Sequence, residues 1–103
     1  MMQFRQGDVF LISSDSVPNG AKPVQSEGGR VVLAHGEVTG HSHAIDRRAC
    51  KLFRDEAGGT WLHVLRPTAL RHEEHAPVKL DAGVFKVTVQ REYRPEGLRN
   101  VVD

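Results

Sequence analysis

Residues 50–66 read CKLFRDEAGGTWLHVLR. Two runs that contain apolar and aromatic residues, 50–54 and 60–66, flank a polar loop that ends in two glycines. Such a loop predicts a β-hairpin, because glycine adopts the positive backbone angles that tight connections need. Pro67 ends the second run, since proline cannot donate a hydrogen bond to a sheet. The sequence therefore predicts antiparallel β-structure at its centre.

Similar strand signals recur on both sides of this hairpin, each closed by turn residues. No segment keeps a helical period for three turns. Besides the hairpin, we expect strands at residues 9–13, 30–35, 41–46, 68–72, 78–80, 84–94 and around 98–102. About eight short strands predict an all-β fold, either a small barrel or a jelly-roll-like sandwich, because these architectures protect strand edges by closure or near closure.

The composition is typical of a soluble globular protein: 39% of the 103 residues are hydrophobic, 26% are charged, and the formal net charge is +1. This length predicts one β domain over residues 1–103. Near-neutral charge does not predict nucleic-acid binding, which usually needs a basic excess. The single cysteine excludes an internal disulfide, and no apolar run fits a signal peptide or a membrane span. We therefore expect a cytoplasmic protein with no membrane partner.

Two short motifs contain most of the histidines: GEVTGHSH at residues 36–43 and HEEH at residues 72–75. Alternate residues of a strand share a face, so His41 and His43 point inward if Ile45 faces the core. The same alternation places the even-numbered residues from 70 to 80, which are mostly apolar, on one inward face. Both motifs are therefore expected to turn histidines toward the interior.

Neutral imidazole is a ligand for divalent transition metals such as Zn, Ni, Mn and Fe. Three imidazoles and one carboxylate leave a coordination position open for water or a substrate. The candidate ligands are His41, His43, His72, His75 and Glu74, with Glu73 as the alternative carboxylate. Glu37 precedes His41 in the chain and could orient an imidazole by accepting a hydrogen bond from it.

The two histidines of the second motif are alternatives for the third nitrogen ligand. If the even-numbered residues from Leu70 to Leu80 face the core, His72 is the ligand and His75 lies on the opposite face or in a turn. Pro77 could shift this register by one residue, because proline in an alternating run often marks a bulge. A helical turn over residues 72–75 would instead put both histidines on one face.

Metal binding is the leading hypothesis for the function. The alternative is a non-enzymatic module whose histidines bind a small molecule or a protein partner without metal, and a homo-oligomer is compatible with either hypothesis. An enzyme depends on the first hypothesis: the metal would activate water or hold an anionic small molecule, with Glu74 or Glu37 as proton acceptor. The residues specify a ligand set rather than a reaction.

The His-x-His motif on a β-rich chain distantly resembles the cupin superfamily. That resemblance covers architecture alone, because Arg47 and Arg48 stand where the cupin glutamate would fall and Lys86 stands where the last histidine would. The chain more closely resembles a group of small uncharacterised bacterial proteins with four motifs. These motifs are QGDV at residues 6–9, GEVTGHSH at 36–43, HEEH at 72–75 and QREY at 90–93.

Overall fold

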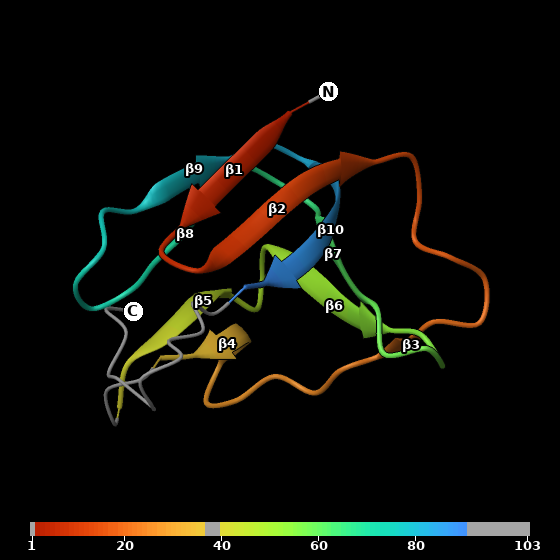
Figure 1. Cartoon of the computed structure of the whole chain (residues 1–103), viewed down its shortest axis with the longest axis horizontal. Helices are drawn as coiled ribbons and strands as arrows, with labels where there is room; N and C mark the ends of the chain where they lie inside the picture. Colours follow the sequence, from red (N-terminus) through yellow and green to blue (C-terminus); the bar gives the residue numbers. More distant parts are fainter. Residues whose placement is uncertain (1, 37–39, 91–103) are drawn as a thin grey trace, which may run out of the picture.

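The computed structural model describes residues 2–36 and 40–90, and within them the chain is built from β-strands (Figure 1). The strands are β1 Gln3–Gln6, β2 Val9–Ser14, β3 Lys22–Pro23, β4 Arg30–His35, β5 Ser42–Asp46, β6 Cys50–Arg54, β7 Thr60–Val64, β8 Thr68–Leu70, β9 Val78–Leu80 and β10 Gly83–Val89. These residues include no helix that is long and apolar enough to span a membrane. The prediction of an all-β fold is confirmed.

Six strands form the main antiparallel sheet, in the order β1-β2-β10-β7-β6-β3. The hairpin predicted at residues 50–66 is β6–β7, in which Leu52 lies opposite Leu62. The edge strands β1 and β3 do not pair with each other. Over the described residues the sheet is therefore not closed. The barrel, which was one of the two expected architectures, is not formed there.

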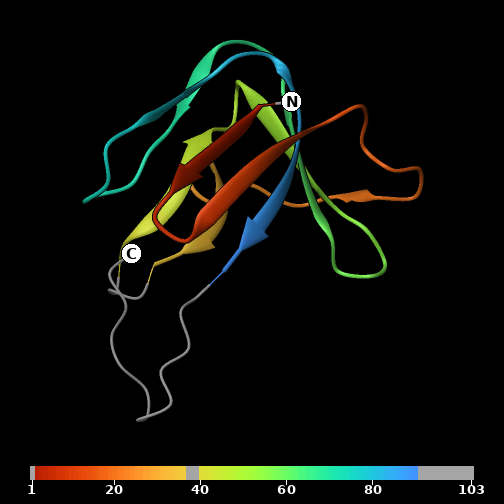
Figure 2. The same ribbon diagram turned by 45° about the horizontal axis from the view of Figure 1, so that its top comes forward.

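Two smaller sheets, β4–β5 and β8–β9, complete the described part of the fold. A backbone bridge joins them: Ala44 of β5 and Arg71, which follows β8, exchange two N–H to carbonyl hydrogen bonds of 2.9 Å. In Figures 1 and 2, β5, β8 and β9 lie at the end of the molecule away from β3. The bridge brings the two histidine motifs together, although about thirty residues separate them in the sequence.

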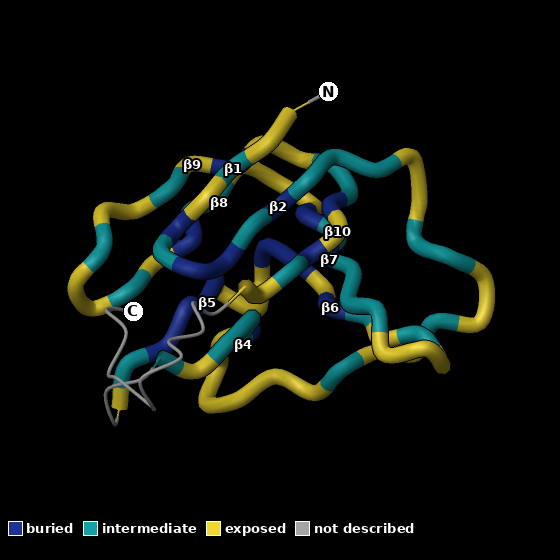
Figure 3. The backbone as a smooth tube through the Cα atoms, viewed as in Figure 1, coloured by how far each residue is buried: buried dark blue, intermediate teal, exposed yellow. Residues whose placement is uncertain are grey.

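The apolar core lies where these sheets meet (Figure 3). Alternate residues of β2 and β7 point into it, and Val9, Leu11, Leu62 and Val64 are completely buried. Ile45 of β5 is buried in the same cluster. The sequence predicted that His41 and His43 point inward if Ile45 faces the core, and Ile45 does face it.

The prediction that the even-numbered residues from 70 to 80 share one inward face is wrong. The chain reverses between β8 and β9, so that Leu70 pairs with Val78, and the polar connection exposes Glu74 and Ala76. Strands β1 and β3 were not predicted, because β1 carries a single apolar side chain and β3 has only two residues, one of them a proline. Three predicted features lie outside the described residues: Glu37, residues 91–94 of the predicted strand 84–94, and the predicted strand near 98–102.

Candidate metal centre

Four histidine rings meet where β5 passes the connection between β8 and β9. The ring of His72 contacts the other three, with centroid distances of 4.4 Å to His43, 4.7 Å to His75 and 5.4 Å to His41. His43 belongs to β5 and His41 immediately precedes it, whereas His72 and His75 come from the connection. The structure thus brings all four predicted histidine ligands into one cluster.

The chain turns sharply after His72, and this turn explains why both histidines of the second motif reach the cluster. The Nδ1 atom of His72 accepts hydrogen bonds from the backbone N–H groups of Glu74, at 3.0 Å, and His75, at 3.4 Å. The ring of His75 then stacks 5.8 Å from that of His43. Within the described residues, its Nε2 atom is buried without a hydrogen-bond partner. His75 lies in a turn, as expected, but its ring points to the same side as that of His72.

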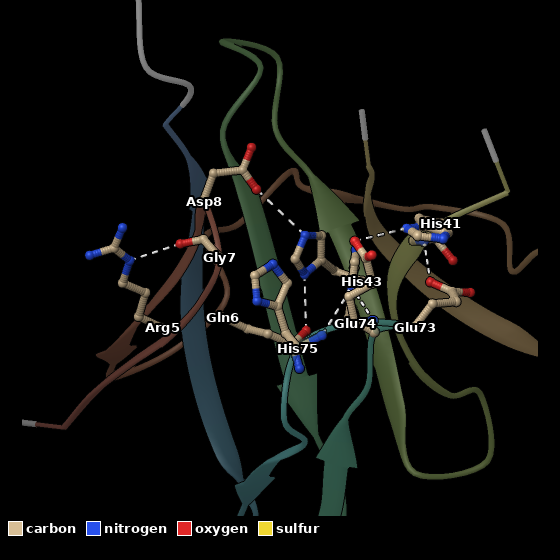
Figure 4. A network of polar contacts seen from close by, with 11 residues as sticks. Arg5, Gln6, Gly7, Asp8, His41, His43, Glu73, Glu74 and His75 are labelled. Atoms are coloured by element: carbon tan, nitrogen blue, oxygen red, sulfur yellow. Dashed lines mark hydrogen bonds and ion pairs between the residues drawn. The ribbon is translucent and has the colours of Figure 1, made fainter. Parts of the chain in front are cut away.

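Gln6 fixes the orientation of the His43 ring. The Nε2 amide of Gln6 donates to the carbonyl oxygens of Leu70, at 2.9 Å, and Ala76, at 3.0 Å. Its Oε1 atom is therefore the acceptor facing His43 Nδ1, at 2.9 Å (Figure 4). Because Nδ1 must donate this bond, it carries a proton, and in the neutral ring Nε2 keeps its lone pair. His43 thus has the tautomer in which Nε2 can bind a metal.

Asp8 approaches the other side of the same ring, with its Oδ1 atom 3.5 Å from His43 Nε2. Gln6 and Asp8 flank the turn between β1 and β2, and both side chains are buried. The sequence interpretation assigned neither residue to the site, because β1 was not recognised as a strand and so nothing placed it beside β5. The available signal was the motif QGDV at residues 6–9, whose polar residues stand immediately before a core strand.

Two adjacent carboxylates lie beside His41. Glu74 Oε1 is 3.6 Å from His41 Nδ1, and Glu73 Oε1 accepts a hydrogen bond of 2.9 Å from the backbone N–H of Ser42. The backbone N–H groups of Ser42 and of Glu73 itself, with smaller contributions from His41 and His72, hold the pKa of the Glu73 carboxyl below its ordinary value. Glu73 is therefore ionised at neutral pH.

One nitrogen of His41, one nitrogen of His72 and one oxygen of Glu73 lie within 4.8 Å of one another. Ligands about 2.1 Å from a tetrahedral ion are about 3.4 Å apart, so modest side-chain rotations would close the remaining distance. The carboxylate of this group is Glu73, the alternative that the sequence left open. Glu74 lies next to it and contacts His41.

A family model described as "Domain of unknown function (DUF8820)" matches residues 5–90. The chain belongs to this family. No curated protein and no solved structure matches it. The region matched by DUF8820 includes Gln6, Asp8 and both histidine motifs, so the whole cluster lies within it. The expected resemblance to uncharacterised proteins is supported as membership of a domain family of unknown function. None of the comparisons supports the resemblance to cupins.

Three residues of this DUF8820 chain remain to be placed: the predicted residue Glu37 and the two histidines outside the motifs, His35 and His63. Glu37, expected to orient an imidazole, lies outside the described residues. His35 is exposed on β4, where its Nε2 atom lies 3.3 Å from Glu27 Oε1. His63 is half-buried on β7, opposite Lys51 of β6 and Val84 of β10. His35 is therefore a natural control for experiments on the cluster.

Proposed function

We propose that the protein binds one divalent transition metal ion, such as Zn, Ni, Mn or Fe, through His41, His72 and Glu73. The observation that carries this proposal is the grouping of their three ligand atoms within 4.8 Å. Two imidazoles and an ionised carboxylate are a donor set common to these metals. Three protein ligands leave at least one position for water, a further histidine or a small molecule.

His43 is the candidate fourth ligand. Gln6 holds its proton on Nδ1, and a metal-binding histidine commonly donates that N–H to an oxygen acceptor in the same way. The ring of His43 lies 4.4 Å from that of His72, and its Nε2 atom faces Asp8 Oδ1 at 3.5 Å, so a metal bound there would also lie beside the Asp8 carboxylate. His75, whose buried Nε2 lacks a partner within the described residues, is the next candidate.

One observation favours the metal-free alternative, a module in which the histidines bind a small molecule or a protein. Because His72 Nδ1 accepts two backbone hydrogen bonds, the neutral ring carries its proton on Nε2. A metal could bind Nε2 only if the ring took the other tautomer and released the N–H groups of Glu74 and His75. Metal binding by His72 is therefore expected to rearrange the connection between β8 and β9.

Equilibrium dialysis of protein purified without a histidine tag, followed by metal analysis, separates the two functions. The matched pair is Glu73→Gln against Glu74→Gln, with His72→Ala against His35→Ala as a second pair. Glu73→Gln keeps an oxygen that can accept the hydrogen bond from Ser42, so its fold is retained. We expect about one equivalent of metal in the wild type, and affinity at least about tenfold lower in Glu73→Gln and His72→Ala but not in the two controls.

The proposal is wrong if the wild type binds less than about a tenth of an equivalent of each metal and gains no thermal stability from it. A ligand at 100 times its Kd stabilises the native state by about 2.7 kcal/mol, so specific binding has a clear thermal signature. Equal metal affinity in Glu73→Gln and Glu74→Gln would remove Glu73 from the ligand set.

A further inference from the structure

A small pocket opens beside the candidate metal centre. Its volume is about 200 Å³, and it is lined by Arg30, Ser42, Arg71, His72 and Glu73. A second pocket of about 680 Å³ shares Arg30 and Arg71 with it. The two arginines therefore line both the pocket at the metal centre and a larger space within the usual size range of small-molecule sites.

Neither arginine is neutralised by a neighbour in the described part of the chain. Asp46 lies opposite Arg30 in the β4–β5 ladder, but its carboxylate binds Arg48, with an Nη2 to Oδ2 distance of 2.8 Å. Glu27 is bridged to Arg30 through the backbone, but its carboxylate pairs with His35. Arg71 has no ion pair there either. Guanidinium groups bind carboxylate and phosphate through paired hydrogen bonds, so two of them at one pocket favour an oxyanion.

Ser42 supplies an independent observation at the same pocket. The residue is only 3% exposed, and its Oγ atom has no hydrogen-bond partner within residues 2–36 and 40–90. A buried hydroxyl without a partner is destabilising, and such groups in native structures are usually satisfied by water or a ligand. Because Ser42 lines the pocket, a bound oxyanion could accept a hydrogen bond from this hydroxyl.

Glu73 also lines the pocket, and its ionised carboxylate repels an anion. A divalent ion bound to Glu73 would cancel this charge and could offer an open coordination position to the same anion. Oxyanion binding is therefore expected to require the metal.

We infer that this pocket binds the carboxylate or phosphate group of a small molecule, held by Arg30, Arg71 and the Ser42 hydroxyl. The body of the ligand extends into the larger pocket, whose walls include the apolar side chains Ala44, Ile45, Pro67, Ala69 and Leu80. The inference rests on the proposed metal site, because the metal offsets the charge of Glu73.

Calorimetric titration with hexanoate, hexyl phosphate and uncharged hexan-1-ol tests the inference. Each titration is done on protein whose metal content has been measured, with and without metal. We expect at least one anionic probe to bind the metal-loaded protein at least about tenfold more tightly than hexan-1-ol does. The same probe should bind the metal-free protein at least about tenfold more weakly. Binding of hexanoate or of hexyl phosphate alone would assign the oxyanion as carboxylate or phosphate.

Arg71→Gln should weaken binding of that probe at least about tenfold without changing the metal content. Arg54→Gln, at an exposed position on β6, is the matched control and should bind as the wild type does. Ser42→Ala should weaken probe binding several-fold while leaving the melting temperature unchanged or higher, because it removes a hydroxyl that has no partner in the described structure. A merely structural serine would lower the melting temperature instead.

The outcomes separate this inference from the proposed function. Protein that takes up no metal overturns the proposed function before any probe is added, and the inference with it. Metal-loaded protein that binds neither anion below about 10 mM, or binds hexan-1-ol equally well, overturns the inference alone. Unchanged probe affinity in Arg71→Gln also overturns it.

Discussion

Gln6→Met tests how the β1–β2 turn supports the histidine cluster. Methionine has nearly the same size as glutamine but cannot replace its hydrogen bonds. The change removes the Gln6 hydrogen-bond partner of two buried groups, His43 Nδ1 and the Leu70 carbonyl. It also removes the hydrogen bond from Gln6 to the Ala76 carbonyl, which is partly buried. An unsatisfied buried polar group costs about 1–3 kcal/mol, so the two buried groups together predict a loss of about 2–6 kcal/mol.

That loss is a large share of the roughly 5–15 kcal/mol that stabilises a typical domain. Chemical denaturation at pH 7 measures it directly, and the melting temperature should fall by at least about 10 °C. Gln3→Met is the matched control, because Gln3 is exposed on the same strand. The control should change the free energy of unfolding by less than about 0.5 kcal/mol. A loss below about 1 kcal/mol in Gln6→Met would refute the assignment of these hydrogen bonds.

Three further predictions concern the rest of the fold. Burial raises the pKa of the Cys50 thiol to about 12, so at pH 8 a thiol reagent should react at least about 100-fold more slowly than in denatured protein, and a comparable rate would contradict the burial. Hydrogen bonds from the Gly59 backbone and the Trp61 indole lower the pKa of Asp55. The ionised Asp55 side chain therefore stabilises the fold above the unfolded pKa of about 3.9, and this stabilisation is lost as pH falls through the folded pKa. The melting temperature of the wild type should approach that of Asp55→Asn between pH 5 and pH 2, and a constant difference would contradict this. Leu62→Ala, at a completely buried position, should lower the free energy of unfolding by about 2–5 kcal/mol in urea titrations, and a loss under about 1 kcal/mol would place Leu62 outside the core.

The β6–β7 hairpin could be predicted because its signals are local. A polar loop with two glycines separates two strands that pair directly with each other, and no distant residue is needed to recognise them. The bounds of β4 and β9 were also predicted for this reason, since turn residues or proline mark their ends. The edge strand β1 lacks such a signal, because it depends on pairing with β2 and carries mostly polar side chains.

The convergence of the histidine motifs was inferred from strand alternation, which correctly predicted a buried His43 and Ile45 in β5 but failed for residues 70–80. His43 and Ile45 are both buried as predicted, but Ser42 and Ala44 are buried as well, so β5 is covered on both faces. Beyond Leu70 the chain turns back, and local hydrogen bonds to His72 Nδ1 set the position of His75. The Ala44–Arg71 bridge and the contacts of Gln6 link residues far apart in the chain, so no local pattern could predict them.

An anomalous difference map would test the central claim most directly. The measurement uses crystals of protein purified without a histidine tag and supplied with one equivalent of Zn, with data collected above the Zn absorption edge. We predict one dominant peak about 2.0–2.2 Å from a nitrogen of His41, a nitrogen of His72 and an oxygen of Glu73. The absence of a peak among these three residues, or a dominant peak at a surface residue such as His35, would contradict the proposed metal centre.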